Sequence, residues 1–379
     1  MLNKKLYDVI VIGAGPSGTS FAYNLKVRSP KSKILLLDKQ AFPRYKPCGG
    51  GVSPEVQNYF DFDLTPAIDS ICNDVIMVAN GKQIESSDFP LWMVRREKFD
   101  NYLLNKTKAK GVEFLANCEV TQIERGSNIN KLTTSLGEFD STYVVIAEGG
   151  RGKLANKLGL SVKNTVLAAL EYEHYTDNLD GKLYIDFDYN NNGYAWNFPK
   201  SDGLSLGIGG FIKSQDKGKV GLPAKLSSYS KQFEVAELTK ANLHGHPILL
   251  YSGRQKLVHD NVILIGEMAG CVDPLTAEGI RPAIKSGYLA AKVVAYVLNN
   301  NKPKALVNYD VAFHREIGQD FYYARIMAYF LNKNLKRILP MISTKSAVNG
   351  FMSIFSGRTT YREKINFKRI GKMMWKTLF

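Results

Sequence analysis

Three glycines near the start of the chain limit its fold more than any other feature. Gly13, Gly15 and Gly18 form a GxGxxG motif between a β-branched run at residues 6–12 and a helix-like segment. Asp38 ends the next strand-like run, 20 residues after the last glycine. Such glycines let backbone N–H groups approach a pyrophosphate at a helix N-terminus, and the acid can accept hydrogen bonds from a ribose. The sequence therefore predicts a βαβ unit that binds a dinucleotide; glycines that only form a turn are the alternative.

Composition narrows the class of protein further. The chain has 379 residues, of which 45% are apolar and 22% charged, so we expect a folded protein of two or three units rather than a disordered one. Lys and Arg number 50 against 35 Asp and Glu, a net charge of +15. This surplus favours an anionic partner, whether a lipid headgroup, a nucleic acid or a nucleotide.

The remaining sequence features exclude several classes. The four cysteines lie far apart without CxxC pairs, and the N-terminus lacks a signal peptide, so we expect a cytoplasmic protein. No apolar stretch reaches the ~20 residues that a membrane span needs. His244 and His246 have no third metal ligand at a suitable spacing, and no hydrolase or zinc motif is present, so we expect no metal.

The order of strand-like and helix-like segments predicts an α/β fold. We expect a Rossmann-like nucleotide-binding domain, whose first part spans residues 1–160 and includes a short insertion near 74–92. Short strands, turns and aromatic residues predict an inserted, mostly antiparallel sheet at 161–254, which would be the substrate domain. The nucleotide-binding domain would then resume at 255–300, and a helical, basic region would form 301–379.

Three further segments, together with the glycine motif, resemble the FAD-binding oxidoreductases of the p-hydroxybenzoate hydroxylase type, and within them the geranylgeranyl reductase family. They are RREKFDNYL with Arg96 and Asp100, VVIAEGG with Glu148 and Gly149, and VILIGEMAGCVDPLTAEGI at 262–280. Glu148 and Glu267 stand where the family usually has aspartate, and Ala277 replaces a common glycine.

The resemblance implies a bound FAD and assigns its contacts. Glu267 after Gly266 would bind the ribityl chain, and backbone amides at a helix N-terminus would face the flavin ring. The implied cofactor residues are Gly13, Gly15, Gly18, Asp38, Lys39, Cys48, Gly49, Gly50, Arg96, Glu148, Gly149, Gly266, Glu267, Gly279 and Ile280. A second nicotinamide domain is not indicated, so the electron donor would be transiently bound NAD(P)H or a ferredoxin.

Two segments bear on the substrate. RYKPCGGGVSP at 44–54 is similar to the family's loop beside the flavin, where Cys48 would donate a proton or position the substrate; a small turn residue is the alternative. Arg44 and Lys46 would either supply positive charge near the flavin or a substrate phosphate, or be solvated surface charges, which is the interpretation that we favour. GYAWNFP places Tyr194, Trp196 and Phe198 on one face of a strand that Pro199 would end.

This aromatic row matches the family's Y-x-W-x-F-P motif, which implies a long apolar cavity for an isoprenoid chain. An inward core row of the sheet is the physical alternative, and flavin-dependent halogenases carry a similar motif. A basic, aromatic C-terminal segment, FKRIGKMMWKTLF, and the upstream stretch 325–342 would suit an interfacial helix on an anionic membrane, or a terminal helix packed on its own domain.

The leading hypothesis is an FAD-dependent reductase of isolated double bonds in a geranylgeranyl or polyprenyl chain, with hydride from flavin N5. The second is a flavin monooxygenase or halogenase that acts on an aromatic or polyene substrate. The third is a non-catalytic, basic membrane-surface protein with a degenerate flavin site. We do not expect nucleic acid as a partner, because the basic aromatic segment suits lipid better than stacked bases.

Overall fold

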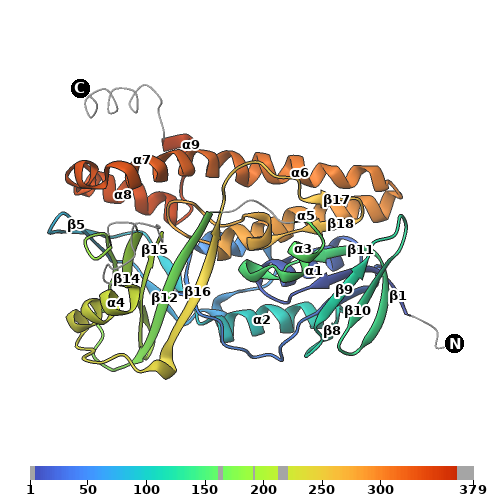
Figure 1. Ribbon diagram of the computed structural model, residues 1–379, viewed down its shortest axis with the longest axis horizontal. Coiled ribbons are helices and arrows are strands. Elements are labelled where there is room, and N and C mark those ends of the chain that lie inside the picture. The colour runs from blue at the N-terminus through green and yellow to red at the C-terminus, as the bar shows by residue number, and fades with distance from the viewer. Residues whose placement is uncertain (1–4, 161–164, 191–192, 212–220, 365–379) are drawn as a thin grey trace.

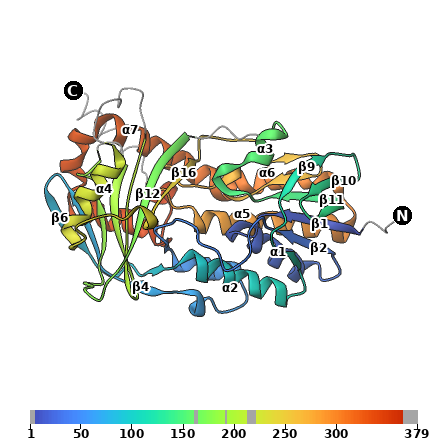
Figure 2. The ribbon, with the colours of Figure 1, turned by 60° about the horizontal axis from the view of Figure 1, so that its bottom comes forward.

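The computed structural model describes residues 5–160, 165–190, 193–211 and 221–364. Two large sheets lie at opposite ends of the elongated molecule, and long C-terminal helices run along the same side of both (Figure 1). Turning the molecule keeps the two sheets apart, with β1 (Leu6–Ile12) toward one end and β6 (Lys82–Ser86) toward the other (Figure 2). The fold is therefore a mixed α/β fold, as the sequence predicts.

The first sheet contains the βαβ opening. Its strands follow the order β17-β18-β11-β1-β2-β8, with β9 and β10 extending β11 as a hairpin. Strand β1 pairs in parallel with both β2 and β11, and β11 pairs in parallel with β18. These four strands are β-branched or leucine-rich and mostly buried, as expected for a parallel sheet covered on both faces. The strands are β1 (Leu6–Ile12), β2 (Ile34–Leu37), β8 (Glu113–Leu115), β9 (Val120–Glu124), β10 (Asn130–Thr134), β11 (Gly137–Ile146), β17 (Val258–His259) and β18 (Val262–Leu264).

Four helices belong to this part of the fold, and two of them, α1 and α5, pack tightly on each other. A side chain on Gly287 would collide with the carbonyl oxygen of Ser17, so α1 and α5 cross closely. The helices are α1 (Pro16–Arg28), α2 (Arg96–Ala109), α3 (Lys153–Lys157) and α5 (Ile280–Asn300).

The second sheet has the strand order β16-β12-β15-β14-β13-β5-β6 and is antiparallel except for the parallel pair β13 and β5. Residues of the short stretch near 74–92 thus extend a sheet built mainly from residues after 164. Strand β14 continues through Pro199 to Lys200, so the expectation that Pro199 ends the strand is wrong. The strands are β5 (Val75–Ala79), β6 (Lys82–Ser86), β12 (Thr165–Tyr175), β13 (Leu183–Asp186), β14 (Gly193–Lys200), β15 (Gly203–Gly210) and β16 (Leu243–Leu250).

A small sheet of order β3-β7-β4 packs beside β14 of the second sheet. Its strands are β3 (Gly51–Val52), β4 (Ser70–Cys72) and β7 (Leu91–Met93). Helix α4 (Leu222–Ser230) packs on the second sheet through the buried Leu226 and Tyr229.

The C-terminal region is helical, with α6 (Asn308–Phe313), α7 (Gln319–Ile342), α8 (Lys345–Phe355) and α9 (Tyr361–Lys364). The stretch 325–342 belongs to α7, whereas the basic aromatic segment 367–379 lies outside the described residues. Within the part of the chain that the structure describes, no helix combines the length and apolarity that crossing a bilayer requires.

Candidate active site

The carboxyl ends of four parallel strands bring the predicted cofactor motifs to one edge of the first sheet. The glycine motif follows β1, Asp38 follows β2, Glu148 lies just beyond β11, and Gly266 lies just beyond β18. A side chain on Gly13, whose φ is +106°, would collide with the carbonyl oxygen of Ala147. The glycine loop therefore rests against the end of β11. In open parallel sheets this edge is where nucleotides bind.

The glycine loop presents the N-terminus of α1. Gly15 is the N-cap and Pro16 the first helical residue, and no side chain caps the helix, so its first amides are available to a ligand. Asp38 accepts hydrogen bonds from the N–H of Ala14 at 2.8 Å and of Gln40 at 2.9 Å. The carboxylate thus holds the glycine loop in place and retains lone pairs that can accept further hydrogen bonds. Lys39, the next residue, is exposed.

Two arginines share one buried carboxylate beside this loop. Arg96 binds Asp100 through Nε at 2.8 Å and Nη2 at 2.7 Å, and Arg44 adds a third contact at 3.1 Å. Both guanidinium groups are largely buried, and Nη1 of Arg44 has no hydrogen-bond partner within the protein. One positive charge is therefore left uncompensated next to Gly15. The expectation that Arg44 is a solvated surface charge is wrong.

The two glutamates that replace aspartates differ in their surroundings. Glu148 accepts hydrogen bonds from the N–H groups of Leu154 at 3.1 Å and Ala155 at 3.2 Å, which caps α3. Glu267 is partly buried and accepts from the N–H of Leu249 at 3.0 Å and from that of Gly150. Burial raises the pKa of both carboxyl groups. Glu267 joins the motifs after β11 and β18, whereas Glu148 holds the local backbone.

The loop that carries Cys48 crosses to the second sheet. The N–H of Cys48 donates to Glu171 at 2.7 Å, and its side chain lies near the guanidinium group of Arg96. Gly50 has a φ of +75°, and a side chain there would collide with the carbonyl oxygen of Val94. The structure thus places Cys48 between the cofactor edge of the first sheet and the second sheet.

Lys46 lies in the same loop and is also less exposed than its sequence suggests. Its Nζ lies 2.8 Å from Nε2 of His246, in a partly buried position. Burial, with help from Arg96 and Arg44, lowers the pKa of Lys46 to about 8. The expectation of a solvated surface lysine is therefore wrong.

A tight turn from Asp273 to Gly279 precedes α5. Asp273 is buried and accepts hydrogen bonds from the N–H groups of Leu275 at 2.7 Å and Thr276 at 3.1 Å and from the hydroxyl of Tyr361 at 2.8 Å. Ala277 has a left-handed φ of +58°, which costs an alanine about 1–2 kcal/mol and explains why glycine is natural there.

The N-terminus of α5 follows directly from this turn. Gly279 caps the helix without a side-chain hydrogen bond, and Ile280 is its first residue. The first amides of α5 are therefore available to a ligand, as the resemblance implies.

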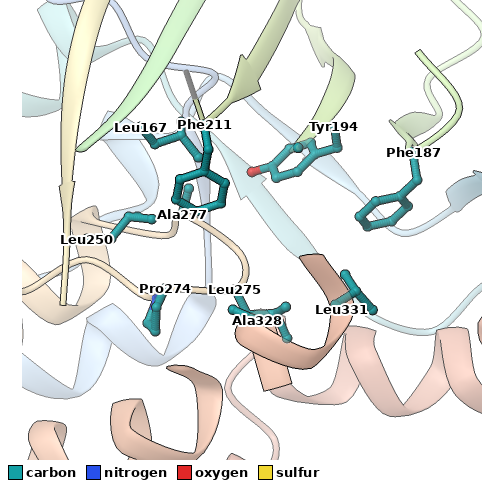
Figure 3. A pocket seen from close by; sticks show the side chains of 11 residues that line it. Leu167, Phe187, Tyr194, Phe211, Leu250, Pro274, Leu275, Ala277, Ala328 and Leu331 are labelled. Atoms are coloured by element: carbon teal, nitrogen blue, oxygen red, sulfur yellow. The ribbon is translucent and has the colours of Figure 1, made fainter. Parts of the chain in front are cut away.

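An apolar cavity lies between this turn, the second sheet and α7 (Figure 3). Tyr194 reaches into it from β14 and donates its hydroxyl hydrogen to the carbonyl oxygen of Thr276 at 2.6 Å. The lining residues are Leu167, Phe187, Gly193, Tyr194, Phe211, Leu250, Pro274, Leu275, Ala277, Ala328 and Leu331.

The aromatic row of β14 does not line this cavity as a whole. The rings of Trp196 and Phe198 lie against Gly49, and Nε1 of Trp196 is buried without a hydrogen-bond partner. Pro199 accepts a hydrogen bond from Ser70 at 3.2 Å, away from the cavity-lining residues. Tyr194 therefore meets the cavity, while Trp196 and Phe198 pack on the loop of Cys48.

Sequence reasoning missed Glu171 on β12 and Lys200 on β14. Both side chains hydrogen-bond the backbone of the loop that carries Cys48. Both are charged residues in strands whose neighbours are mostly apolar. Their one sequence signal was a charge at a position where strand alternation predicts burial.

The site fits FAD by its own chemistry. The unpartnered Nη1 of Arg44 and the free amides of α1 suit a diphosphate, and the free amides at the start of α5 suit the oxygen atoms of a flavin ring. Only glycine fits at position 13, which lets the loop pack against the end of β11 at the edge where the nucleotide would bind.

Comparisons with known proteins agree with this chemistry. A family model described as lycopene cyclase protein matches residues 8–197, half of the chain. A digeranylgeranylglycerophospholipid reductase of Methanococcus vannielii is 28% identical over 305 residues, covering 76% of this chain and 77% of the relative.

Two solved structures share the fold. A geranylgeranyl bacteriochlorophyll reductase-like protein from Thermoplasma acidophilum has a TM-score of 0.78 at 18% identity, covering 93% of this chain and 96% of the other. A flavin-dependent brominase has a TM-score of 0.75 at 19% identity, covering 93% and 94%.

The fold, the site and the family match define an FAD-dependent oxidoreductase, not the non-catalytic surface protein that the positive charge left open. Within this superfamily the chain belongs to the family that the lycopene cyclase model describes, and the resemblance to the geranylgeranyl reductases is confirmed.

Proposed function

We propose that this protein reduces isolated carbon–carbon double bonds in a geranylgeranyl or related polyprenyl chain. The observation that carries the proposal is the apolar cavity between the second sheet, α7 and the 273–279 turn. Its lining includes leucine, phenylalanine and alanine side chains, and the described charged residues of the site lie outside it. An isoprenoid chain has no polar groups to recognise, so its binding free energy must come from burial of apolar surface.

The residues around the cavity have different roles in the proposed reaction. The glycine loop, Arg44, Asp38 and the start of α5 would hold FAD, which supplies the two electrons for saturating a double bond when it is bound and reduced. Tyr194 fixes the turn beneath the cavity through its hydrogen bond to Thr276. The apolar lining excludes water, so that a reactive alkene carbon is protonated only by a positioned acid.

Cys48 is the proposed acid. Cys48 is partly exposed and lies near Arg96, whereas the three other cysteines are buried. A thiol at this place can hold a proton and release it to the carbon opposite the one that is reduced. The electron donor would be NAD(P)H or a ferredoxin, and an anionic membrane surface would present the lipid.

Mass spectrometry tests the proposal directly. We would incubate dithionite-reduced, FAD-loaded protein with geranylgeranyl lipids and look for products that are heavier by pairs of hydrogen atoms. Trp196→Ala and Cys48→Ala should each lower turnover while flavin content stays intact. Tyr296→Ala, which removes an exposed ring on α5, is the matched control and should react as wild type.

The structural similarity to a brominase supports one alternative, a halogenase or monooxygenase that acts on an aromatic or polyene substrate. This activity would consume O2 in proportion to product. Lipid products without added hydrogen, together with coupled O2 consumption, would contradict the reductase and select the alternative.

A further inference from the structure

Two arginines near the apolar cavity have no acidic partner. Arg325 on α7 donates to the carbonyl oxygen of Ser252 and lies over the ring of Tyr322, 5.6 Å from its centre. Arg254 is exposed two residues further along the loop that contains Ser252. Among the residues that the structure describes, no carboxylate forms an ion pair with either guanidinium group. Two positive charges are therefore available to an anion.

Two neutral polar groups belong to the same cluster. A side chain on Gly318 would come within 2.9 Å of Nδ1 of His314 and 3.1 Å of the hydroxyl oxygen of Tyr251. This Nδ1 is buried, and the described part of the chain offers it no hydrogen-bond partner. Burial lowers the pKa of His314, and the nearby Arg254 adds to the shift. Burial raises the pKa of Tyr251, and both arginines oppose that shift, so all four side chains lie close together.

The cluster lies beside the cavity. Strand β16 ends at Leu250, which lines the cavity, and Tyr251 is the next residue. Ala328 lines the cavity from α7 (Figure 3), about 4.5 Å along the helix axis from Arg325. No lining residue carries a charge, and an ionised group is costly to bury among apolar side chains. An anionic group on a bound lipid must therefore be held outside the cavity.

We propose that Arg254 and Arg325 bind the phosphate group of an isoprenoid lipid whose chain enters the apolar cavity. This inference rests on the proposed function, since it places the head of the proposed substrate. Guanidinium groups match phosphate oxygens with paired hydrogen bonds, and Nδ1 of His314 can donate one more when it carries the imidazole hydrogen. Apolar burial is not directional, so the phosphate contact sets how far the chain enters and which double bond reaches the flavin.

Lipid binding to the full-length, FAD-loaded protein with oxidised flavin tests the inference without any reduction. The ligands are geranylgeranyl phosphate and geranylgeraniol, compared by isothermal titration calorimetry in the same detergent. Wild type should bind the phosphate about tenfold more tightly than the alcohol, or better. Arg254→Gln and Arg325→Gln should each weaken phosphate binding about tenfold and leave alcohol binding unchanged. Arg254→Lys keeps the charge and should recover part of the loss.

Two controls identify the source of the signal. Arg315→Gln removes an exposed charge that pairs with Glu316, and this variant should bind both compounds as wild type does. Inorganic phosphate should bind far more weakly than geranylgeranyl phosphate, because it has no chain to bury. If inorganic phosphate binds as tightly as the lipid, the site takes free phosphate and the assignment to a lipid head is wrong.

The remaining outcomes separate the two proposals. Equal wild-type affinities for the phosphate and the alcohol overturn the inference. So do arginine variants that weaken both compounds alike, because the arginines would then shape the cavity without binding phosphate. A phosphate preference that the variants abolish, without lipid reduction in the mass-spectrometric assay, defeats only the proposed function. Lipid reduction without a phosphate preference defeats only this inference, and binding of neither compound contradicts both.

Discussion

At the scale of single residues, Arg44 is the clearest sign of a bound anion. Arg96 already satisfies Asp100 through two hydrogen bonds, so the charge of Arg44 is in excess, and its Nη1 has no partner. A buried cation in this state is costly unless a ligand meets it. We therefore expect the diphosphate of FAD, or an equivalent anion, to lie beside Arg44.

We accordingly expect Arg44→Gln to weaken FAD binding by about 10- to 100-fold, since a charge-assisted hydrogen bond is worth about 1.5–3 kcal/mol. Titration of the FAD-free protein with FAD, followed by flavin fluorescence, measures the change. The matched control is Arg315→Gln on the exposed surface, whose affinity should equal that of wild type. Equal FAD affinity in all three proteins would contradict the assignment.

Lys46 gives the site a pH dependence. Its pKa of about 8 means that it loses its proton as the pH rises through that value, and an anionic ligand binds the protonated form more tightly. FAD affinity should therefore fall as the pH rises from 7 to 9, by up to about tenfold. Lys46→Gln should bind weakly already at pH 7 and show no inflection near 8. A wild-type profile parallel to that of the variant would exclude Lys46 as the cause.

At the scale of secondary-structure elements, α7 forms one wall of the apolar cavity that we propose as the substrate site. It contributes Ala328 and Leu331 to the cavity, opposite Tyr194 of β14 (Figure 3). The other walls belong to the sheet and to the turn before α5, whose backbone Asp273 fixes. Substrate length should therefore respond most directly to side-chain volume on α7.

Ala328→Leu should fill the cavity and lower turnover of a geranylgeranyl lipid at least tenfold, with FAD content unchanged, because Ala328 lies on α7 and the cofactor motifs lie on other elements. The same mass-spectrometric assay and the flavin absorbance of the purified protein supply both readouts. Tyr329→Leu, an exposed position on the same helix, controls for effects on α7. Full activity of Ala328→Leu would mean that the lipid binds elsewhere.

At the scale of the whole molecule, the sequence predicts the position of the cofactor motifs better than it predicts which residues surround them in space. The glycine loop, Asp38 and Glu267 come together because strand ends of one parallel sheet meet at one edge, and local patterns reveal that geometry. The burial of Arg44 and Lys46 could not be predicted, because it depends on where a loop crosses from the first sheet to the second. Glu171 and Lys200 were missed for the same reason, since their partners lie more than 100 residues away.

A buried carboxyl group also makes the stability of the whole fold depend on pH. Asp186 ends β13 with 3% of its surface exposed, and burial raises its pKa from 3.8 to about 6. The folded state then binds a proton more tightly than the unfolded state, so the contribution of Asp186 to the free energy of unfolding increases as the pH falls from 7 to 4. At pH 7 the same carboxylate destabilises the fold, because it is ionised and only backbone N–H groups compensate it.

Asp186→Asn removes this charge and keeps an oxygen that can accept the N–H of Asp188. We expect the variant to exceed wild type by about 1–2 kcal/mol in the free energy of unfolding at pH 7, and to lose that advantage near pH 4. Urea unfolding of both FAD-loaded proteins across this range measures the difference, in which the contributions of all other carboxyl groups cancel. Parallel curves for the two proteins would mean that Asp186 titrates at its ordinary pH in the folded chain.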